Sequence, residues 1–519
     1  MTIRGLRATA VVALALMAAP LPAIAQATPE VIEEAQRTLD ELGYDVGTPD
    51  GVIGRRTQAA IEAFQAEAGL PVTGEIDEAT RTALLDPALI AAVEDGDDDR
   101  VETLLAAGAN PNLTPPEGPP ALIRAVANEE LAIVALLLAA GADPDTVADG
   151  SSALGVAIAT GNLAVVEAVI AGGATVDPPE GVTPLLTAAN ADDLALVQLL
   201  LDGGADPSRT GPAGRTPLLI ATSNGNLDMV NAVLAAGANV NGLGPSGESP
   251  LIVAAARGNL AIVQALIAAR ANPNIQDPTG LTALAWATDR GHEDVVLALL
   301  GMGVNANLAD AQGLTPLMAA VISGRADIVT LILNSGASFN ATDARGRTAL
   351  AWAVHRDLTA IAEILLGVGV NLNIADAAGV TPLMVAAAHG NAEAAVALLA
   401  RGASIHALDR DGENALFKAV RAGSLPIVQL LLDAGINVNV QNASLDTITL
   451  LAAAANEIEI LAAILDAGGA ANSMNMQSRT PLSLAADGGF DEAVALLLAH
   501  GATTQRAGAL RQYLPLPAY

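Results

Sequence analysis

The sequence contains no cysteine, and this absence excludes several classes of site at once. The chain cannot form a disulfide, a zinc–thiolate centre, a thiol nucleophile or a lipid-modified N-terminal cysteine. Aromatic residues make up only 2% of the 519 residues, and Lys418 is the only lysine. After the N-terminal segment, no stretch reaches 18 uncharged apolar residues without a glycine or proline, so the sequence predicts no membrane insertion.

Positive charge is also scarce. The chain carries 24 Lys and Arg residues against 56 Asp and Glu residues, which gives a formal charge of −32. This balance argues against nucleic acid and anionic membranes as partners, and it leaves basic proteins, cations and neutral polymers open. A chain of this length is too long for a single core, so we expect several domains or a repeat array.

Residues 1–25 have the pattern of a secretory signal peptide. Arg4 and Arg7 precede an uncharged apolar stretch from residue 8 to residue 19, and Ala23-Ile24-Ala25 fits an A-x-A cleavage site. Removing these residues removes two arginines and no acids, so the charge becomes (24 − 2) − 56 = −34. We therefore expect an exported chain.

A motif with a period of 33 residues fills most of the chain. Thr-Pro-Leu begins at Thr216, Thr315 and Thr381, and the equivalent anchor positions are 183, 216, 249, 282, 315, 348, 381 and 414. Looser anchors at 87, 120, 152, 448 and 480 bring the count to about 13 repeats over residues 86–505. In each repeat the anchor is placed to cap a helix whose first residue is often proline, and a glycine follows each helix.

This motif resembles the ankyrin repeat, and the unit from Asp310 to Gly324 is near the family consensus. The resemblance implies an all-α solenoid of helix pairs with β-turn or hairpin fingers between them. One departure recurs, because the residue after the leucine is apolar here (Met318, for example) where the family usually has histidine. We expect residues 506–519, which match no repeat, to form a separate C-terminal tail.

Residues 28–85 do not follow the repeat and predict a small three-helix bundle. Apolar faces mark two helices, a third short helix is expected from Asp77 to Leu84, and Asp50-Gly51-Val52-Ile53-Gly54 fits a tight turn. The string Gly43-Tyr44, Asp50-Gly51, Gly54, Thr57, Phe64-Gln65 and Gly69-Leu70-Pro71-Val72-Thr73-Gly74 resembles the peptidoglycan-binding domain of bacterial cell-wall enzymes. The resemblance implies a bacterial protein that contacts murein, either in the periplasm or outside a Gram-positive cell, and the nearly lysine-free composition favours the periplasm. Candidate contact residues are Asp50, Gly51, Gly54, Thr57, Phe64 and Gln65, although the fold alone could require them, and Phe64 also fits the core.

No constellation of catalytic residues stands out. The five histidines make no H-E-x-x-H pair, and neither a G-x-S-x-G elbow nor a Walker loop is present. We therefore expect no enzyme, no metal and no cofactor.

Basic residues recur at the ends of the predicted first helices and in the fingers, where ankyrin proteins usually bind. The candidates for partner binding are Arg215, Arg257, Arg290, Arg345, Arg347, His355, Arg356, His389, Arg410 and Arg421. One hypothesis is a basic strip that binds a carboxylate-bearing partner or an anionic polymer. The other is compensation of helix dipoles, with nearby acids such as Asp289 and Glu413 neutralising the strip. Trp286 and Trp352 occupy equivalent helix positions, where core packing is expected.

These observations predict a non-catalytic exported scaffold that binds an unidentified protein partner through its repeats while the small domain contacts peptidoglycan. The alternative is a regulator, either an inhibitor or a recruiter, of a cell-wall hydrolase or another periplasmic enzyme. A third possibility is an enzyme with an unrecognised site. Because Asp86-Pro87 leaves almost no linker, we expect the two domains to pack rigidly.

Overall fold

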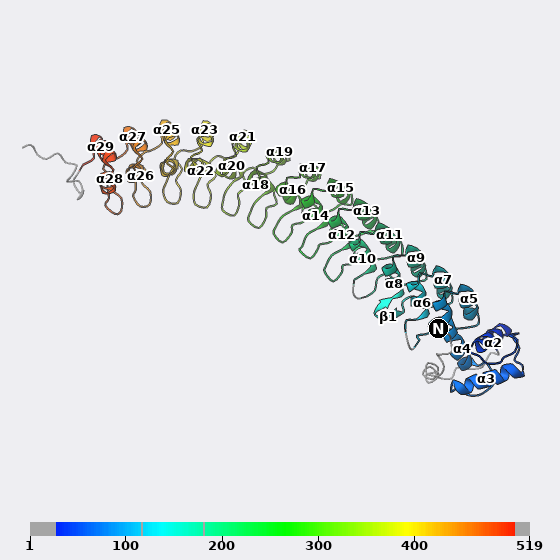
Figure 1. The fold of residues 1–519 in the computed structure, drawn as a ribbon. Coiled ribbons are helices and arrows are strands. Elements are labelled where there is room, and N and C mark those ends of the chain that lie inside the picture. The colour runs from blue at the N-terminus through cyan, green and yellow to red at the C-terminus, as the bar shows by residue number, and fades with distance from the viewer. Residues whose placement is uncertain (1–26, 116–117, 180–181, 504–519) are drawn as a thin grey trace, which may run out of the picture. The chain divides into compact units, whose positions relative to one another are not determined.

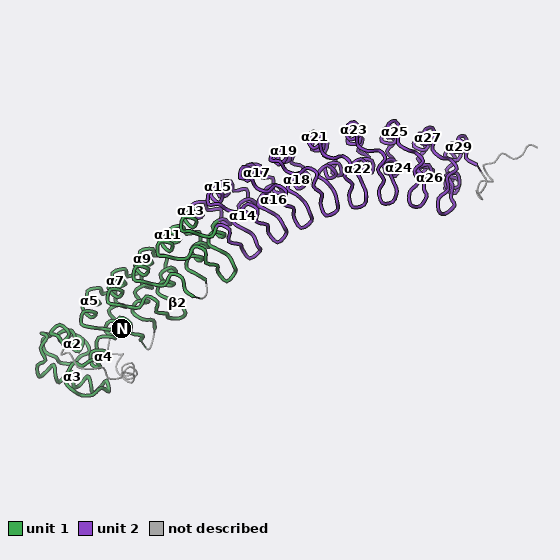
Figure 2. Tube along the Cα trace, turned by 180° about the vertical axis from the view of Figure 1, so that it is seen from behind, with its two compact units in different colours: residues 1–221, 231–239 green, residues 222–230, 240–519 purple. Residues whose placement is uncertain are grey.

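The structure is a computed structural model that describes residues 27–115, 118–179 and 182–503. The expected signal peptide and C-terminal tail lie outside these residues. The chain divides into two compact units, which Figure 2 shows in green and purple. Unit 1 comprises residues 1–221 and 231–239, and unit 2 comprises residues 222–230 and 240–519.

Unit 1 begins with the expected three-helix arrangement. Helix α2 (Pro29–Glu41) starts after the cap Thr28, and helix α3 (Arg55–Glu67) starts after Gly54. Helix α4 (Glu78–Asp95) starts at Asp77, whose side chain accepts a hydrogen bond from the Thr80 N–H. Their buried faces include Leu39, Ile61 and Leu84, so the apolar stripes read from the sequence do form a small core.

The expected end of the third helix near Leu84 is wrong. Helix α4 continues through Pro87 to Asp95 and ends at Gly96, which has the left-handed conformation. Proline removes one backbone donor, but Leu85 and Leu89 on either side of it are completely buried, and this burial outweighs the lost bond. One helix therefore belongs both to the small domain and to the first repeat.

Buried charges join the small domain to the first repeat. Arg100 in helix α5 (Asp98–Ala106) pairs with Glu34 of helix α2 and, at 3.1 Å, with Glu41. Glu34 is only 2% exposed, and its burial raises its pKa although Arg100 opposes the shift. Asp86, 1% exposed, accepts a bond from the Asn110 N–H, and burial raises its pKa to about 6. These contacts indicate a close-packed junction, as the short connection predicts.

Pairs of short antiparallel helices make up the rest of the chain (Figure 1). In each unit the first helices of successive repeats form one layer and the second helices form another. The first helices are α6 (Ala121–Ala127), α8 (Ala153–Thr160), α10 (Pro184–Asn190), α12 (Pro217–Asn224), α14 (Pro250–Arg257), α16 (Ala283–Arg290), α18 (Pro316–Ile322), α20 (Ala349–His355), α22 (Pro382–His389), α24 (Ala415–Arg421), α26 (Ile448–Ala455) and α28 (Pro481–Gly488).

The second helices pack behind them. They are α7 (Leu131–Ala139), α9 (Leu163–Ala171), α11 (Leu194–Asp202), α13 (Leu227–Ala235), α15 (Leu260–Ala268), α17 (Glu293–Leu300), α19 (Ala326–Asn334), α21 (Thr359–Gly367), α23 (Ala392–Ala400), α25 (Leu425–Asp433), α27 (Ile458–Asp466) and α29 (Asp491–Ala499). With the second half of α4 and with α5, the described residues contain thirteen such pairs. No pair can bury its apolar face alone, so stability comes from stacking on neighbours.

The fingers are the segments that lead from the second helix of one repeat to the first helix of the next. Strands β1 (Val147–Ala148) and β2 (Ser151–Ser152) form a small antiparallel hairpin in one finger of unit 1. In unit 2, Asp343 accepts hydrogen bonds from the N–H groups of Arg345 and Arg347, each at 2.9 Å. The N–H of Ala344 then donates to the carbonyl of Gln312 in the preceding finger.

This finger arrangement recurs along unit 2. Residues that accept backbone bonds in the same way are Asp277, Asp310, Asp376, Asp409, Asn442 and Asn475. Each finger from that of Asp310 to that of Asn475 also donates one backbone N–H to a carbonyl of the preceding finger. The donors are Ala311, Ala344, Ala377, Arg410, Ala443 and Met476. The fingers from that of Asp277 to that of Asn475 therefore form a continuous hydrogen-bonded row that fixes their backbone positions.

Candidate functional site

Two glutamines hold the loops of the small domain in equivalent ways. The Gln36 side chain accepts bonds from the N–H groups of Asp50 and Gly51 and donates to Thr57. The Gln65 side chain likewise accepts from the two backbone N–H groups at residues 73 and 74 and donates to Thr80. Both glutamines are completely buried, and the two loops share one hydrogen-bonding arrangement.

The structure separates the six candidate murein residues into two sets. Thr57, Phe64 and Gln65 are at most 5% exposed and support the fold from inside. Gly51 has φ +72°, and a Cβ there would lie 2.6 Å from the Pro29 carbonyl, so this position also has a backbone requirement. The exposed candidates are Asp50 and Gly54.

The two accessible candidates of the small domain therefore lie on one exposed loop. Asp50 and Gly54 flank Val52 and Ile53, whose side chains are 63% and 37% exposed. The Asp50 carboxylate accepts a 3.0 Å bond from the Val52 N–H and a 3.2 Å bond from Gln36, and these hydrogen bonds lower its pKa. The loop thus presents a fixed charged and apolar surface to the outside.

Unit 2 has a second accessible surface, which we call the inner face. It comprises the residues four, seven and eight positions after the anchor in each repeat from α14 to α24, together with the adjoining fingers. The side chain at the fourth position is partly exposed in every one of these repeats. These residues are Val253, Trp286, Ala319, Trp352, Val385 and Lys418.

The expectation that both tryptophans belong to the core is wrong. Trp286 donates its indole N–H to Asp277 at 2.8 Å, and Trp352 donates to Asp343 at 3.1 Å. The guanidinium of Arg347 lies 3.8 Å from the centroid of the Trp352 ring, and that of Arg290 lies 5.4 Å from Trp286. A finger carboxylate thus binds each half-buried ring through its indole N–H.

This network favours the ionised form of the finger carboxyl groups. Burial raises the pKa of Asp343, but hydrogen bonds from the backbone and side chain of Arg347 outweigh it and hold the pKa below its usual value. Burial also raises the pKa of Asp277, and bonds from Thr279 and Trp286 reverse the shift in the same way. Both aspartates therefore stay ionised at neutral pH.

Two predicted histidines meet on this face. His355 Nδ1 and His389 Nε2 lie 2.9 Å apart, although the residues come from α20 and α22. The pKa of His355 is lowered, first by burial and then by His389 and the nearby Arg347 and Arg356. The two rings therefore share a hydrogen bond that requires at least one neutral imidazole.

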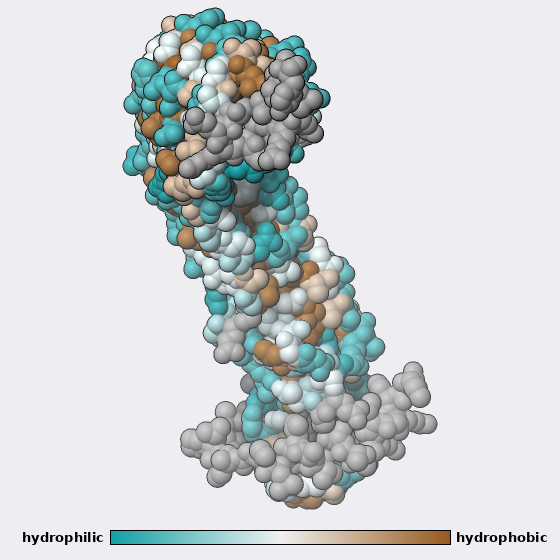
Figure 3. Space-filling model, turned by 90° about the vertical axis from the view of Figure 1, so that its left-hand side faces the viewer, coloured by the Kyte–Doolittle hydropathy of each residue, from teal (hydrophilic) through white to brown (hydrophobic). Residues whose placement is uncertain are grey.

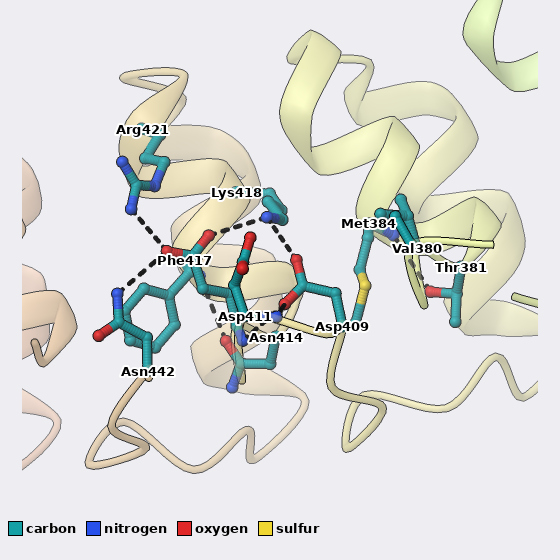
Figure 4. Close-up of polar contacts among 12 residues, drawn as sticks. Val380, Thr381, Met384, Asp409, Asp411, Asn414, Phe417, Lys418, Arg421 and Asn442 are labelled. Atoms are coloured by element: carbon teal, nitrogen blue, oxygen red, sulfur yellow. Dashed lines mark hydrogen bonds and ion pairs between the residues drawn. The ribbon is translucent and has the colours of Figure 1, made fainter. Parts of the chain in front are cut away.

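A charged cluster lies at the α24 end of the inner face (Figure 4). Glu413, 4% exposed, pairs with Lys418 at 2.8 Å and with Arg421 at 2.5 Å, and it accepts a bond from Asn442. Lys418 also pairs with Asp409 at 2.6 Å. Burial raises the pKa of Glu413, but the bonds from Arg421, Lys418 and Asn442 outweigh it and lower the pKa. An open pocket of about 410 Å³ lies beside this cluster, between the finger that carries Asp411 and the finger that carries Asn442.

The remaining predicted residues fall into three groups. Arg347 and Arg421 are paired with buried acids, and Arg290 lies 3.7 Å from Asp289. Exposed arginines on the inner face without a hydrogen-bonding or ionic side-chain partner among the described residues are Arg257, Arg345, Arg356 and Arg410. Arg215 lies in a finger of unit 1 and is half-buried.

Sequence reasoning missed the tryptophans and Lys418 as surface residues. A signal was present in their spacing, because each follows a finger aspartate by nine residues, in the pairs Asp277 and Trp286, Asp343 and Trp352, and Asp409 and Lys418. The three pairs recur in alternate repeats. A donor at this spacing can reach back to the finger carboxylate, whereas Ala319 and Val385 in the intervening repeats cannot.

Comparison with known families decides the class of the chain. A model described as "Ankyrin repeats (3 copies)" matches residues 89–180, 172–243, 251–343, 298–376, 350–442 and 416–508, which is well over half of the chain. The chain belongs to the ankyrin-repeat family. The predicted all-α repeat fold is thereby confirmed. Repeats of this family are of a non-catalytic kind that serves protein–protein interaction.

The small domain matches a second family. A model described as "Putative peptidoglycan binding domain" matches residues 28–84, which confirms the resemblance read from the loop motifs. Among solved structures, the ankyrin repeat domain of Bcl-3, a member of the IkappaB protein family, is 27% identical with a TM-score of 0.38. The match covers 40% of this chain and 94% of that one. No curated protein matches the chain significantly.

The described residues hold neither a membrane-spanning helix nor a cluster of metal ligands. Within them no helix combines the length and apolar character needed to span a membrane. Across the same ranges, no three His, Asp or Glu side chains gather as a metal site would require. On the face shown in Figure 3, apolar residues lie in small groups among hydrophilic ones.

Proposed function

We propose that this chain is an exported, non-catalytic adaptor of the periplasm. Its small domain contacts peptidoglycan, and the inner face of its repeats binds a protein partner. The helix α4 carries this proposal, because a peptidoglycan-binding-like domain and an ankyrin-repeat region share it. A chain that binds the wall through one part would hold the other part at a fixed place and raise its effective concentration there.

The loop from Asp50 to Gly54 is the proposed wall contact. It is an exposed loop that holds the two accessible candidates, and its conformation is fixed by Gln36. A Cβ at Gly54 would meet no atom within 4 Å, and the position has ordinary extended backbone as the cap of α3. A side chain can therefore be added here without disturbing the fold.

Deletion of the small domain would be a poor test, because it would cut α4 and expose Leu84, Leu85 and Leu89. We instead compare co-sedimentation of the full-length chain with purified murein sacculi before and after Val52→Glu and Gly54→Glu. The control is Ala66→Glu, which adds the same charge at an exposed position at the other end of α3, roughly 18 Å away.

Pelleting of the unmodified chain and of the Ala66→Glu variant, with loss of pelleting in the two loop variants, supports wall binding through this loop. Circular dichroism at equal concentration checks that the variants remain folded. Failure of the unmodified chain to pellet, or equal pelleting by folded loop variants, would contradict the proposal.

A further inference from the structure

The inner face exposes several guanidinium groups, while three of its acids are buried. Asp343, Asp409 and Glu413 are 6%, 8% and 4% exposed and are already bound by donors of the chain. Of the other acids, Asp289 (beside Arg290) and Asp411 are exposed, and the finger carboxylates Asp310 and Asp376 are half-buried and accept backbone bonds. A ligand approaching this surface therefore meets exposed guanidinium groups beside acids that the chain itself partly satisfies, although the chain as a whole is strongly acidic.

The four exposed arginines of this face keep their donors available. Arg257 and Arg356 each lie eight residues after an anchor, while Arg345 and Arg410 lie at finger tips. Their guanidiniums bond no other side chain among the described residues. Guanidinium forks bind carboxylates in a bidentate way, so acidic side chains are their natural ligands.

The tryptophans add fixed apolar platforms between these arginines. The indole N–H of each ring is committed to a finger aspartate, and an arginine lies over each ring. Rings held in this way lose little conformational entropy when a ligand covers them. Such a surface favours a ligand that combines carboxylates with an apolar side chain.

The spacing of these groups sets the size of the ligand. First helices of neighbouring repeats lie about 8–10 Å apart, so the three repeat spacings between Arg257 and Arg356 span roughly 24–30 Å. An extended peptide covers this distance in about eight or nine residues. A long polyanion would also meet the acidic remainder of the chain and be repelled by it, whereas a short segment would not.

We propose that the inner face binds an extended acidic segment of a partner protein, with carboxylates about eight residues apart and an apolar residue between them. The carboxylates pair with Arg257 at one end and with Arg356 and Arg345 at the other. The apolar residue lies on Trp286, since Arg347 covers the Trp352 ring at 3.8 Å whereas Arg290 lies 5.4 Å from the Trp286 ring. This assignment rests on the proposed function, because it names the chemistry of the protein partner at the same surface.

The test uses the full-length chain and its only two tryptophans, Trp286 and Trp352, as intrinsic probes. Labelled peptides carry two Glu-Glu pairs separated by two, six or ten residues, with a leucine in the spacer, and matched peptides carry Gln in place of Glu. We expect saturable changes in tryptophan fluorescence and in label anisotropy, strongest for the six-residue spacer and absent with Gln.

Substitutions place the binding on the inner face. Arg257→Glu with Arg356→Glu should weaken the apparent affinity about tenfold or more. The control, Arg270→Glu with Arg401→Glu, makes the same charge change at exposed positions after second helices of unit 2 and should leave the affinity within about twofold.

Equal binding of Glu and Gln peptides, anisotropy changes without a tryptophan response, or preference for an oligonucleotide or a soluble murein fragment would overturn the assignment. Sacculus pelleting distinguishes its failure from that of the proposed function, since the loop variants lie in the small domain. A chain that pellets but ignores acidic peptides remains a wall adaptor with another kind of partner.

Discussion

Buried carboxylates behave in opposite ways in the two units. In unit 1, burial dominates at Glu34 and Asp86, and the pKa of each is raised. In unit 2, burial also acts on Asp277, Asp343 and Glu413, but hydrogen bonds outweigh it and the pKa of each is lowered. Asp277 and Asp343 accept bonds in the repeated finger pattern and Glu413 accepts them in the cluster at α24, whereas Asp86 keeps one buried oxygen without a hydrogen-bond partner among the described residues.

The fingers of the two units also differ in how closely they approach neighbouring fingers. Strands β1 and β2 of unit 1 pair with each other. A Cβ added at their turn glycine, Gly150, would have no atom within 4 Å. At Gly346 in unit 2, a Cβ would lie 2.9 Å from the backbone nitrogen of Ala377 in the next finger. Stacking in unit 2 thus depends on close approach of backbones, and a glycine permits that approach.

The largest expected effect comes from substituting the turn glycines. Gly346→Ala should lower the free energy of unfolding by about 2–4 kcal/mol, since a left-handed alanine costs about 1 kcal/mol and the overlap with the next finger adds more. Gly150→Ala has the same positive φ without a neighbour and should cost only about 1 kcal/mol. Thermal unfolding and amide hydrogen exchange at Ala344 and Ala377 measure the difference.

Equal destabilisation by the two substitutions would show that finger stacking contributes nothing beyond the turn conformation. Faster exchange at Ala344 and Ala377 in the Gly346→Ala variant, with unchanged exchange in unit 1, would instead locate the damage in the finger row.

An intermediate effect is expected at the unit 1 junction. Because the pKa of Asp86 is raised to about 6 in the folded chain, its contribution to stability is present below its unfolded value near 3.8 and is lost as pH rises through 6. Asp86→Asn keeps an acceptor for the Asn110 N–H and removes the titration. Relative to the unmodified chain, the variant should gain about 2 kcal/mol in unfolding free energy between pH 4.5 and pH 7.

Denaturant unfolding of both proteins at the two pH values, followed by exchange in α2 and α4, tests this prediction. Asp343→Asn in unit 2 is the contrasting variant, because its folded pKa is lowered and no gain is expected over the same range. A stability difference for Asp86→Asn that does not change with pH would show that Asp86 is not strained by its burial.

Local sequence signals predicted the repeats but not the surface that they build. Thr315 caps α18 as expected, and the 33-residue period gives the helix pairs directly. The continuation of α4 through Pro87 was unforeseen, because a proline usually ends a helix and only tertiary burial overrides it. The pairing of His355 with His389 was equally hidden, since they lie at different offsets from their anchors and meet only across stacked helices.

The smallest expected effect has the opposite sign. At the position of Gly346, the two C-terminal fingers of unit 2 have Leu445 and Ser478, both with positive φ, 59° and 57°. Ser478→Gly should raise the free energy of unfolding by about 0.5–1 kcal/mol, because glycine adopts this conformation without strain. Leu445→Gly should gain less, because Leu445 is 42% exposed and its buried part loses contacts. Exchange at the Met476 amide, which donates to Ser444, measures both effects; destabilisation by Ser478→Gly would mean that the serine makes a contact more favourable than the strain it carries.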